Sequence, residues 1–114
     1  MKTSNLTAAG AEPDVAALAE ALIACPSVTP ADGLVFDCLE RQLVPLGFAV
    51  HRFVAGDAPD GPVENLFAIR AGPEGSRHFA FAGHLDVVTP GEGWTSAPFA
   101  PERRGAGAAG RRGP

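Results

Sequence analysis

The sequence contains few cysteines, no internal repeat and no apolar run long enough for a signal peptide or a membrane span. Its two cysteines, Cys25 and Cys38, do not lie at zinc-ligand spacing from each other or from a histidine, which argues against a cysteine-based zinc site. A cytoplasmic protein is therefore expected, with both cysteines as thiols packed as small apolar groups. A disulfide between them is the less favoured alternative.

Positive charge is also scarce outside the last segment. Residues 1–102 contain thirteen acidic and five basic residues, a balance of −8, and the four arginines of residues 103–114 bring the net charge to −4. An arginine-rich segment can contact nucleic acid or an anionic surface, but this one has no interleaved aromatic residues and follows an acidic body. We therefore expect neither a nucleic-acid partner nor a membrane partner.

The two ends of the chain lack the pattern of folded elements. Residues 1–11 are mostly polar or small, and residues 103–114 contain only glycine, alanine, arginine and proline. Because neither segment has apolar periodicity of the helix or strand type, neither can bury a face against a core. We expect both segments to be disordered.

Apolar residues recur at helical spacing in two segments, residues 13–24 and 32–46. Asp14 is favourable at the positive end of the first helix dipole. Gly47 is the expected end of the second helix, and Pro45 is expected to disrupt its last turn. Two helices are therefore predicted in the first half of the chain.

Three strands are predicted after the helices, over residues 48–54, 65–70 and 78–83, with turns rich in glycine and proline between them. The third segment is a run of small and aromatic apolar residues that is typical of a buried strand. Two helices followed by three strands predict an α/β fold in which helices flank a mixed β-sheet.

Two ligand-type side chains, His84 and Asp86, follow the third predicted strand directly. Residues i and i+2 of a strand project from the same face, so the two side chains are expected to point into one cleft. A neutral imidazole can bind a divalent metal through one ring nitrogen while a nearby carboxylate holds the ring. Taken alone, the spacing also fits an ordinary loop hydrogen bond.

The other two histidines are poorer candidates for a metal site. His51 lies in the middle of a predicted strand beside Arg52 and Phe53, where a surface or half-buried role is expected. His78 begins the third predicted strand, and six strand residues span about 20 Å, too far for it to share an ion with His84. His84 is therefore the predicted metal ligand.

The segment that contains these residues resembles the first metal motif of the co-catalytic zinc aminoacylase and carboxypeptidase family of metallopeptidases. The motif residues are Gly83, His84, Leu85, Asp86, Val87 and Val88, followed by Pro90, Gly91, Trp94, Thr95, Pro98 and Phe99. Residues 25–30 and 64–66 are further similar to the bacterial succinyl-diaminopimelate desuccinylase group of that family. The resemblance runs from about Val15 to Pro101, the opening part of such an enzyme.

The resemblance implies a metal-dependent amidohydrolase that removes succinate from N-succinyl-LL-diaminopimelate in lysine and diaminopimelate biosynthesis. It implies Zn²⁺ or Co²⁺ as the cofactor, His84 as a metal ligand, and Asp86 at the catalytic position that orients the metal-bound imidazole. The substrate would be a small-molecule N-acyl amino acid, and a homodimer is expected only for a full-length enzyme. Another N-acyl-amino-acid or dipeptide hydrolase of the same family, or a non-catalytic fragment, are the alternatives.

By the same resemblance, residues 12–102 form only part of a catalytic domain. The family's later bridging aspartate, glutamate base and remaining ligands have no match in this sequence, and the composition changes abruptly near Arg104, as a shifted reading frame or a truncated gene would produce. A hydrolytic zinc site needs about three protein ligands and an activated water. We therefore expect this chain to be inactive by itself and to bind metal weakly.

Overall fold

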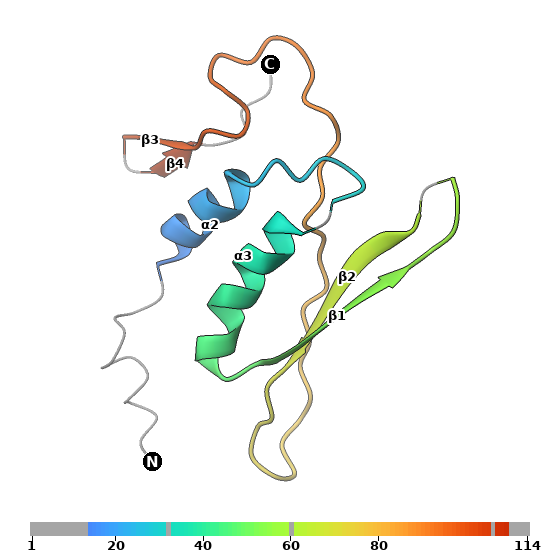
Figure 1. Cartoon of the computed structure of the whole chain (residues 1–114). Helices are drawn as coiled ribbons and strands as arrows, with labels where there is room; N and C mark the ends of the chain where they lie inside the picture. Colours follow the sequence, from blue (N-terminus) through green and yellow to red (C-terminus); the bar gives the residue numbers. More distant parts are fainter. Residues whose placement is uncertain (1–13, 32, 60, 106, 110–114) are drawn as a thin grey trace. The chain divides into compact units, whose positions relative to one another are not determined.

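The computed structural model describes residues 14–31, 33–59, 61–105 and 107–109 (Figure 1). The described chain forms two compact units, one made of residues up to 25 and from 91 onward, the other of residues 26–90. None of its helices is long and apolar enough to cross a membrane. In chain order the elements are α2 (Val15–Ile23), α3 (Leu34–Leu43), the 3₁₀ helix η1 (Val44–Leu46), β1 (Ala49–Ala55), β2 (Val63–Ile69), β3 (Glu102–Arg104) and β4 (Gly107–Ala109).

Helix α2 begins where a side chain can satisfy its first amide groups. Asp14 is the N-cap residue, and its Oδ1 atom accepts hydrogen bonds from the amides of Ala16 at 3.0 Å and Ala17 at 3.2 Å. This contact fulfils the capping preference of a short acidic side chain at a helix start. The helix predicted over residues 13–24 is confirmed, with Asp14 just outside it as the cap.

The unit that contains α2 also contains the short antiparallel hairpin of β3 and β4. Glu102 pairs with Ala109 and Arg104 with Gly107, and Gly105 has a φ of 64°, a backbone conformation that glycine adopts without steric cost. Arg103 forms a two-fold hydrogen-bonded ion pair with Glu20 of α2, with N–O distances of 2.9 and 2.8 Å.

This hairpin differs from the disorder expected for residues 103–114. The composition of the segment carries no sign of a contact, because the pairing of Arg103 depends on a carboxylate 83 positions earlier. The remaining positions of that segment, and residues 1–11, lie outside the described residues, and the predicted extent of a catalytic domain over residues 12–102 stays a prediction.

In the other unit, α3 supplies most of the small core. Val35, Phe36 and Cys38 are buried on one side of this helix, together with Ala31 and Ser27 before it. The helix ends as predicted: Pro45 lies in the tighter turn η1, and Gly47 closes it with a φ of 92°. The predicted helix start at residue 32 is two residues early, because Gly33 is the N-cap residue.

Strands β1 and β2 form an antiparallel hairpin in this same unit, in a register that pairs Ala49 with Ile69 and Ala55 with Val63. The strands predicted over residues 48–54 and 65–70 are confirmed to within two residues at each end. Arg52 of β1 reaches the acidic face of α3, where its Nη1 atom lies 2.6 Å from Asp37 and 3.0 Å from Glu40. These ion pairs connect the helix to the hairpin.

The prediction of a third strand over residues 78–83 is wrong. No regular strand forms there, and the side chains are exposed, at 82% for Phe79 and 91% for Phe81. An extended segment becomes a strand only when a neighbour satisfies its backbone amides and carbonyls, and among the described residues no strand pairs with it. The α/β composition is confirmed, but the predicted mixed sheet is replaced by separate two-stranded antiparallel hairpins.

Candidate metal-ligand site

A short parallel contact within residues 26–90 brings two distant segments together. Val28 forms an isolated β-bridge with Val87, in which the Thr29 amide donates to the Val87 carbonyl and the Val87 amide donates to the Ser27 carbonyl, both at 2.9 Å. The Ser27 hydroxyl donates to the Leu85 carbonyl at 2.8 Å, and Ser27 is buried. Residues 27–29 therefore hold residues 85–87 in one position.

The Asp86 carboxylate is bound through both of its oxygens. Its Oδ2 atom accepts a hydrogen bond from the Thr29 hydroxyl at 2.8 Å, and its Oδ1 atom lies 3.0 Å from Nδ1 of His84. The pKa of the Asp86 carboxyl is below its ordinary value, chiefly because the Thr29 hydroxyl donates to the ionised form; partial burial opposes this shift and the His84 ring adds to it. Asp86 is therefore held as an ionised acceptor.

The surroundings of His84 determine which ring nitrogen carries the proton. Nδ1 lies 2.9 Å from the backbone carbonyl of Asp86 and 3.0 Å from its carboxylate, and both of these groups only accept hydrogen bonds. In the neutral ring, Nδ1 must therefore be the protonated nitrogen, which leaves the lone pair on Nε2. The His84 side chain is 81% exposed, so Nε2 is accessible.

This arrangement fits one histidine ligand of a metal ion. Metal-bound histidines generally donate their other ring N–H to a carboxylate or a backbone carbonyl, and Nδ1 of His84 has one of each as a neighbour. Within the described ranges, no group of three or more histidine, cysteine or acidic side chains could hold an ion. The residues present therefore fit a single ligand and its carboxylate, and not a complete site.

The other predicted features lie away from this pair. His51 stacks with Phe67 across the hairpin, with 6.4 Å between ring centroids, and His78 is exposed on the segment that was predicted as a strand. Both cysteines are thiols, and Cys25 lies 3.4 Å from the carbonyl of Ala21. The structure places His84 and Asp86 in contact, while the cleft expected around them and their roles stay predictions.

The sequence did not predict that Ser27 and Thr29 contact this site. The sequence predicts only a bend over residues 27–30, with a plain connection between helices as the favoured interpretation, and the family resemblance places this bend close to the substrate cleft. Thr29 and Asp86 are 57 positions apart, so no local spacing joins them. The resemblance of this segment to one enzyme group was the one available signal.

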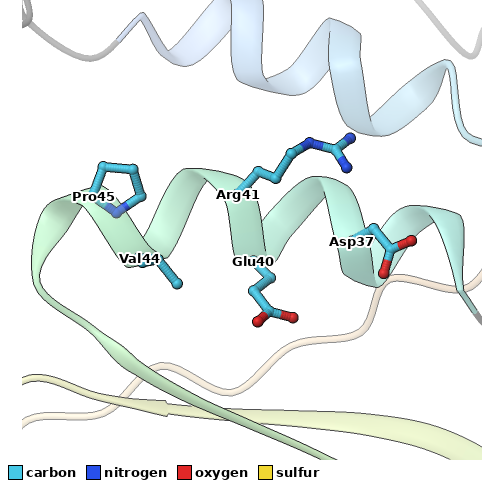
Figure 2. Close-up of a pocket in the computed structure, with 5 residues that line it drawn as sticks. All are labelled: Asp37, Glu40, Arg41, Val44 and Pro45. Atoms are coloured by element: carbon cyan, nitrogen blue, oxygen red, sulfur yellow. The ribbon is translucent and has the colours of Figure 1, made fainter.

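A surface pocket lies elsewhere in the same unit, beside α3 and η1 (Figure 2). It is lined by Asp37, Glu40, Arg41, Val44 and Pro45. Figure 2 shows the two carboxylates projecting to the same side of the helix, where both bind the Arg52 guanidinium. These carboxylates are already paired with Arg52, and neither His84 nor Asp86 lines the pocket. We therefore do not assign metal binding or catalysis to this pocket.

Comparison with known proteins finds relatives that share one name. The chain is 78% identical over 92 residues to the succinyl-diaminopimelate desuccinylase of Novosphingobium aromaticivorans, which covers 81% of this chain and 24% of that protein. It is 71% identical over 91 residues to the protein of the same name in Erythrobacter litoralis, covering 76% of this chain and 24% of the relative. The same name applies in Sphingopyxis alaskensis, at 69% identity over 88 residues, with 77% of this chain and 23% of the relative covered.

The match is therefore close but partial. The chain spans about a quarter of the length of the curated relatives it matches. No protein-family model matches the chain. No solved structure matches it with significance.

Proposed function

We propose that this chain is the N-terminal part of an amidohydrolase of the succinyl-diaminopimelate desuccinylase type, the part that contains the first metal ligand. The chain is similar to such desuccinylases over about four fifths of its own length and spans about a quarter of theirs. The reaction would release succinate from N-succinyl-LL-diaminopimelate, in lysine and diaminopimelate biosynthesis. The contribution of this chain would be one metal ligand and the residues that orient it.

The observation that carries the proposal is the orientation of His84. Its Nδ1 atom is occupied by two acceptors from Asp86, and its exposed Nε2 atom is left with the lone pair that a metal ion needs. The resemblance of residues 83–88 to a metal motif and the shared name of the relatives support the same interpretation.

The residues of this chain would act on the metal rather than on the substrate. When bound, a zinc or cobalt ion supplies Lewis-acid activation of the amide carbonyl and of water. His84 would hold that ion through Nε2, and the Asp86 carboxylate would keep the ring in the required tautomer and increase its basicity as a ligand. The further ligands and a general base must come from residues outside those the structure describes, so we propose no turnover by this chain alone.

A chimeric enzyme tests the proposal. Residues 12–102 of this chain would replace the matching segment of the N. aromaticivorans desuccinylase, and release of succinate from N-succinyl-LL-diaminopimelate would be measured with added zinc. We expect an active chimera. His84→Ala should abolish its activity, because one ligand of the metal is lost, whereas Asp86→Ala should lower kcat/KM by about 10–100-fold.

His51→Ala in the same chimera is the matched control, since His51 is an exposed residue of β1 that stacks with Phe67, and its loss should leave activity unchanged. A folded chimera that contains zinc but releases no succinate would overturn the proposal. A chimera whose activity survives His84→Ala would overturn the metal-ligand role.

The same chimera distinguishes the other substrates of the family. N-acetyl amino acids and dipeptides would be assayed beside the succinylated substrate, and we expect succinyl transfer to water to be the preferred reaction. A preference for a dipeptide would replace the proposed substrate but keep the amidohydrolase role.

As partners we propose the small-molecule substrate and, for the complete enzyme only, a second subunit. The cytoplasm is the proposed compartment, where such biosynthesis occurs and thiols remain reduced.

A further inference from the structure

We propose that Thr29 is a positioning residue that selects the tautomer of His84 by holding the Asp86 carboxylate in place. The inference rests on the proposed function for its meaning, because a histidine that binds a metal through Nε2 needs that atom unprotonated. The contact itself does not depend on that function. The Thr29 hydroxyl lies 2.8 Å from Oδ2 of Asp86, while Oδ1 of the same carboxylate faces His84.

The geometry makes Thr29 the anchor of one end of the carboxylate. Among the described residues, the Thr29 hydroxyl is the one side-chain donor to Oδ2, and the His84 ring is the one side-chain partner of Oδ1. A carboxylate bound at a single oxygen can rotate about its bond to Cβ and move the other oxygen out of range. Two donors on opposite oxygens prevent this rotation, so each contact supports the other.

The Thr29 hydroxyl has one proton and two acceptors within reach. The second acceptor is the Val87 carbonyl at 3.1 Å, which already accepts the Thr29 amide at 2.9 Å. Asp86 is closer and carries a negative charge, and hydrogen bonds to charged acceptors are roughly twice as strong as those to neutral ones. The proton is therefore directed to the carboxylate.

The backbone around Thr29 keeps the hydroxyl at this distance. The bridge between Val28 and Val87 and the hydrogen bond from the buried Ser27 hydroxyl to Leu85 hold the two segments in register. Threonine adds a β-branched side chain, which has few χ1 rotamers. The contact to Asp86 is thus set by the fold and not by the free rotation of a long surface side chain.

Removing the hydroxyl should therefore loosen the tautomer preference of His84. Without the Thr29 hydroxyl, Oδ2 of Asp86 loses its side-chain donor and the carboxylate is held less firmly, while Nδ1 of His84 keeps the Asp86 backbone carbonyl at 2.9 Å as an acceptor. Part of the population should then carry the proton on Nε2, the nitrogen that a metal requires to be unprotonated. The effect acts through Asp86 and needs no contact between Thr29 and the metal.

The test uses the 114-residue chain itself, labelled with ¹⁵N and free of metal. Long-range ¹H–¹⁵N spectra of the His84 ring would be recorded at about pH 8, and the comparison would use the neutral form of the ring. We expect the wild-type ring to show a protonated Nδ1 and an unprotonated Nε2. Thr29→Val, which has nearly the same shape, should shift the two nitrogen resonances toward each other, and Thr29→Ser should preserve the wild-type pattern.

The control is Ser76→Ala, which removes a hydroxyl at an exposed position of the same unit, outside the metal motif, and should leave the His84 spectrum unchanged. Thr29→Ala is a second hydroxyl-free variant in case the valine disturbs the backbone, and the amide spectrum of each variant would verify its fold. A folded Thr29→Val or Thr29→Ala chain with wild-type His84 resonances would overturn the proposal.

A parallel measurement separates this inference from the proposed function. In the chimeric enzyme, Thr29→Val should lower kcat/KM by about 10–100-fold and Thr29→Ser should restore it. An inactive chimera together with the expected tautomer shift would overturn the hydrolase proposal while supporting the role of Thr29. An active chimera with no tautomer shift would support the hydrolase proposal and overturn the role of Thr29.

Discussion

The Glu64 carboxylate binds Arg52 and Gly33 at the same time, with 2.6 Å between its Oε2 atom and Nε of Arg52 and 2.9 Å between its Oε1 atom and the Gly33 amide. Gly33 is the N-cap residue of α3 and has no side chain to satisfy the helix start. Glu64 therefore connects β2, β1 and the start of α3 through a single side chain that is only 15% exposed.

This relationship predicts a loss of stability for Glu64→Gln. The amide keeps one acceptor oxygen, which cannot serve the Arg52 guanidinium and the Gly33 amide equally, and it removes the negative charge beside Arg52. We expect unfolding free energy to fall by about 1–3 kcal/mol, the usual cost of weakening a charged, partly buried hydrogen bond. Urea unfolding monitored by circular dichroism measures it. Glu74→Gln, at an exposed turn, is the matched control and should have no effect.

The same carboxylate predicts a dependence of stability on pH. The Arg52 guanidinium, and next the Gly33 amide, hold the pKa of Glu64 below its ordinary value of 4.5. A depressed folded-state pKa means that the ionised form stabilises the fold above about pH 4.5, and that this contribution is lost as the pH falls through the folded-state value. The difference in unfolding free energy between wild type and Glu64→Gln should therefore shrink on acidification from pH 6. An unchanged difference would show that the charge of Glu64 is not responsible.

The exposed aromatic segment predicts self-association at high concentration. The rings of Phe79 and Phe81 contact each other edge to face, with centroids 5.0 Å apart, and both rings are more than four fifths exposed. Unpaired extended backbone with apolar side chains is a template for pairing between chains. We expect light scattering of the wild type to rise with concentration and that of Phe81→Lys to rise much less. Val15→Lys, at a similarly exposed apolar side chain of α2, should behave like wild type.

Metal removal and replacement test the ligand assignment directly on this chain. One histidine with one supporting carboxylate predicts weak zinc binding, because stable sites use about three or four ligands. We expect titration calorimetry to show this weak binding in wild type and its loss in His84→Ala, whereas His78→Ala should leave it unchanged. Asp86→Ala should weaken it by about 10-fold or more. Tight stoichiometric zinc binding that survives His84→Ala would contradict the assignment.

Several local features followed from the order of residues alone. Asp14 before an apolar periodic segment predicted the start of α2, and Pro45 with Gly47 predicted the tight turn and end of α3. The hairpin of β1 and β2 needs only neighbours along the chain. His84 and Asp86 are in contact because two residues that are two positions apart remain close in almost any extended or turning backbone. In each case the interacting groups are near in sequence, so local patterns predict them.

The tertiary structure decided what depends on distant partners. Phe79 and Phe81 have the pattern of a buried strand, yet burial requires a neighbouring strand that the described residues do not supply. Composition alone predicts that Arg103 belongs to a disordered tail, whereas in the structure its guanidinium pairs with the Glu20 carboxylate of α2. The hydroxyl of Thr29 acquires a role only because a backbone bridge brings it to Asp86. The sequence thus determined the short-range elements and the identity of the candidate ligand, whereas long-range hydrogen bonding determined which of these groups have partners.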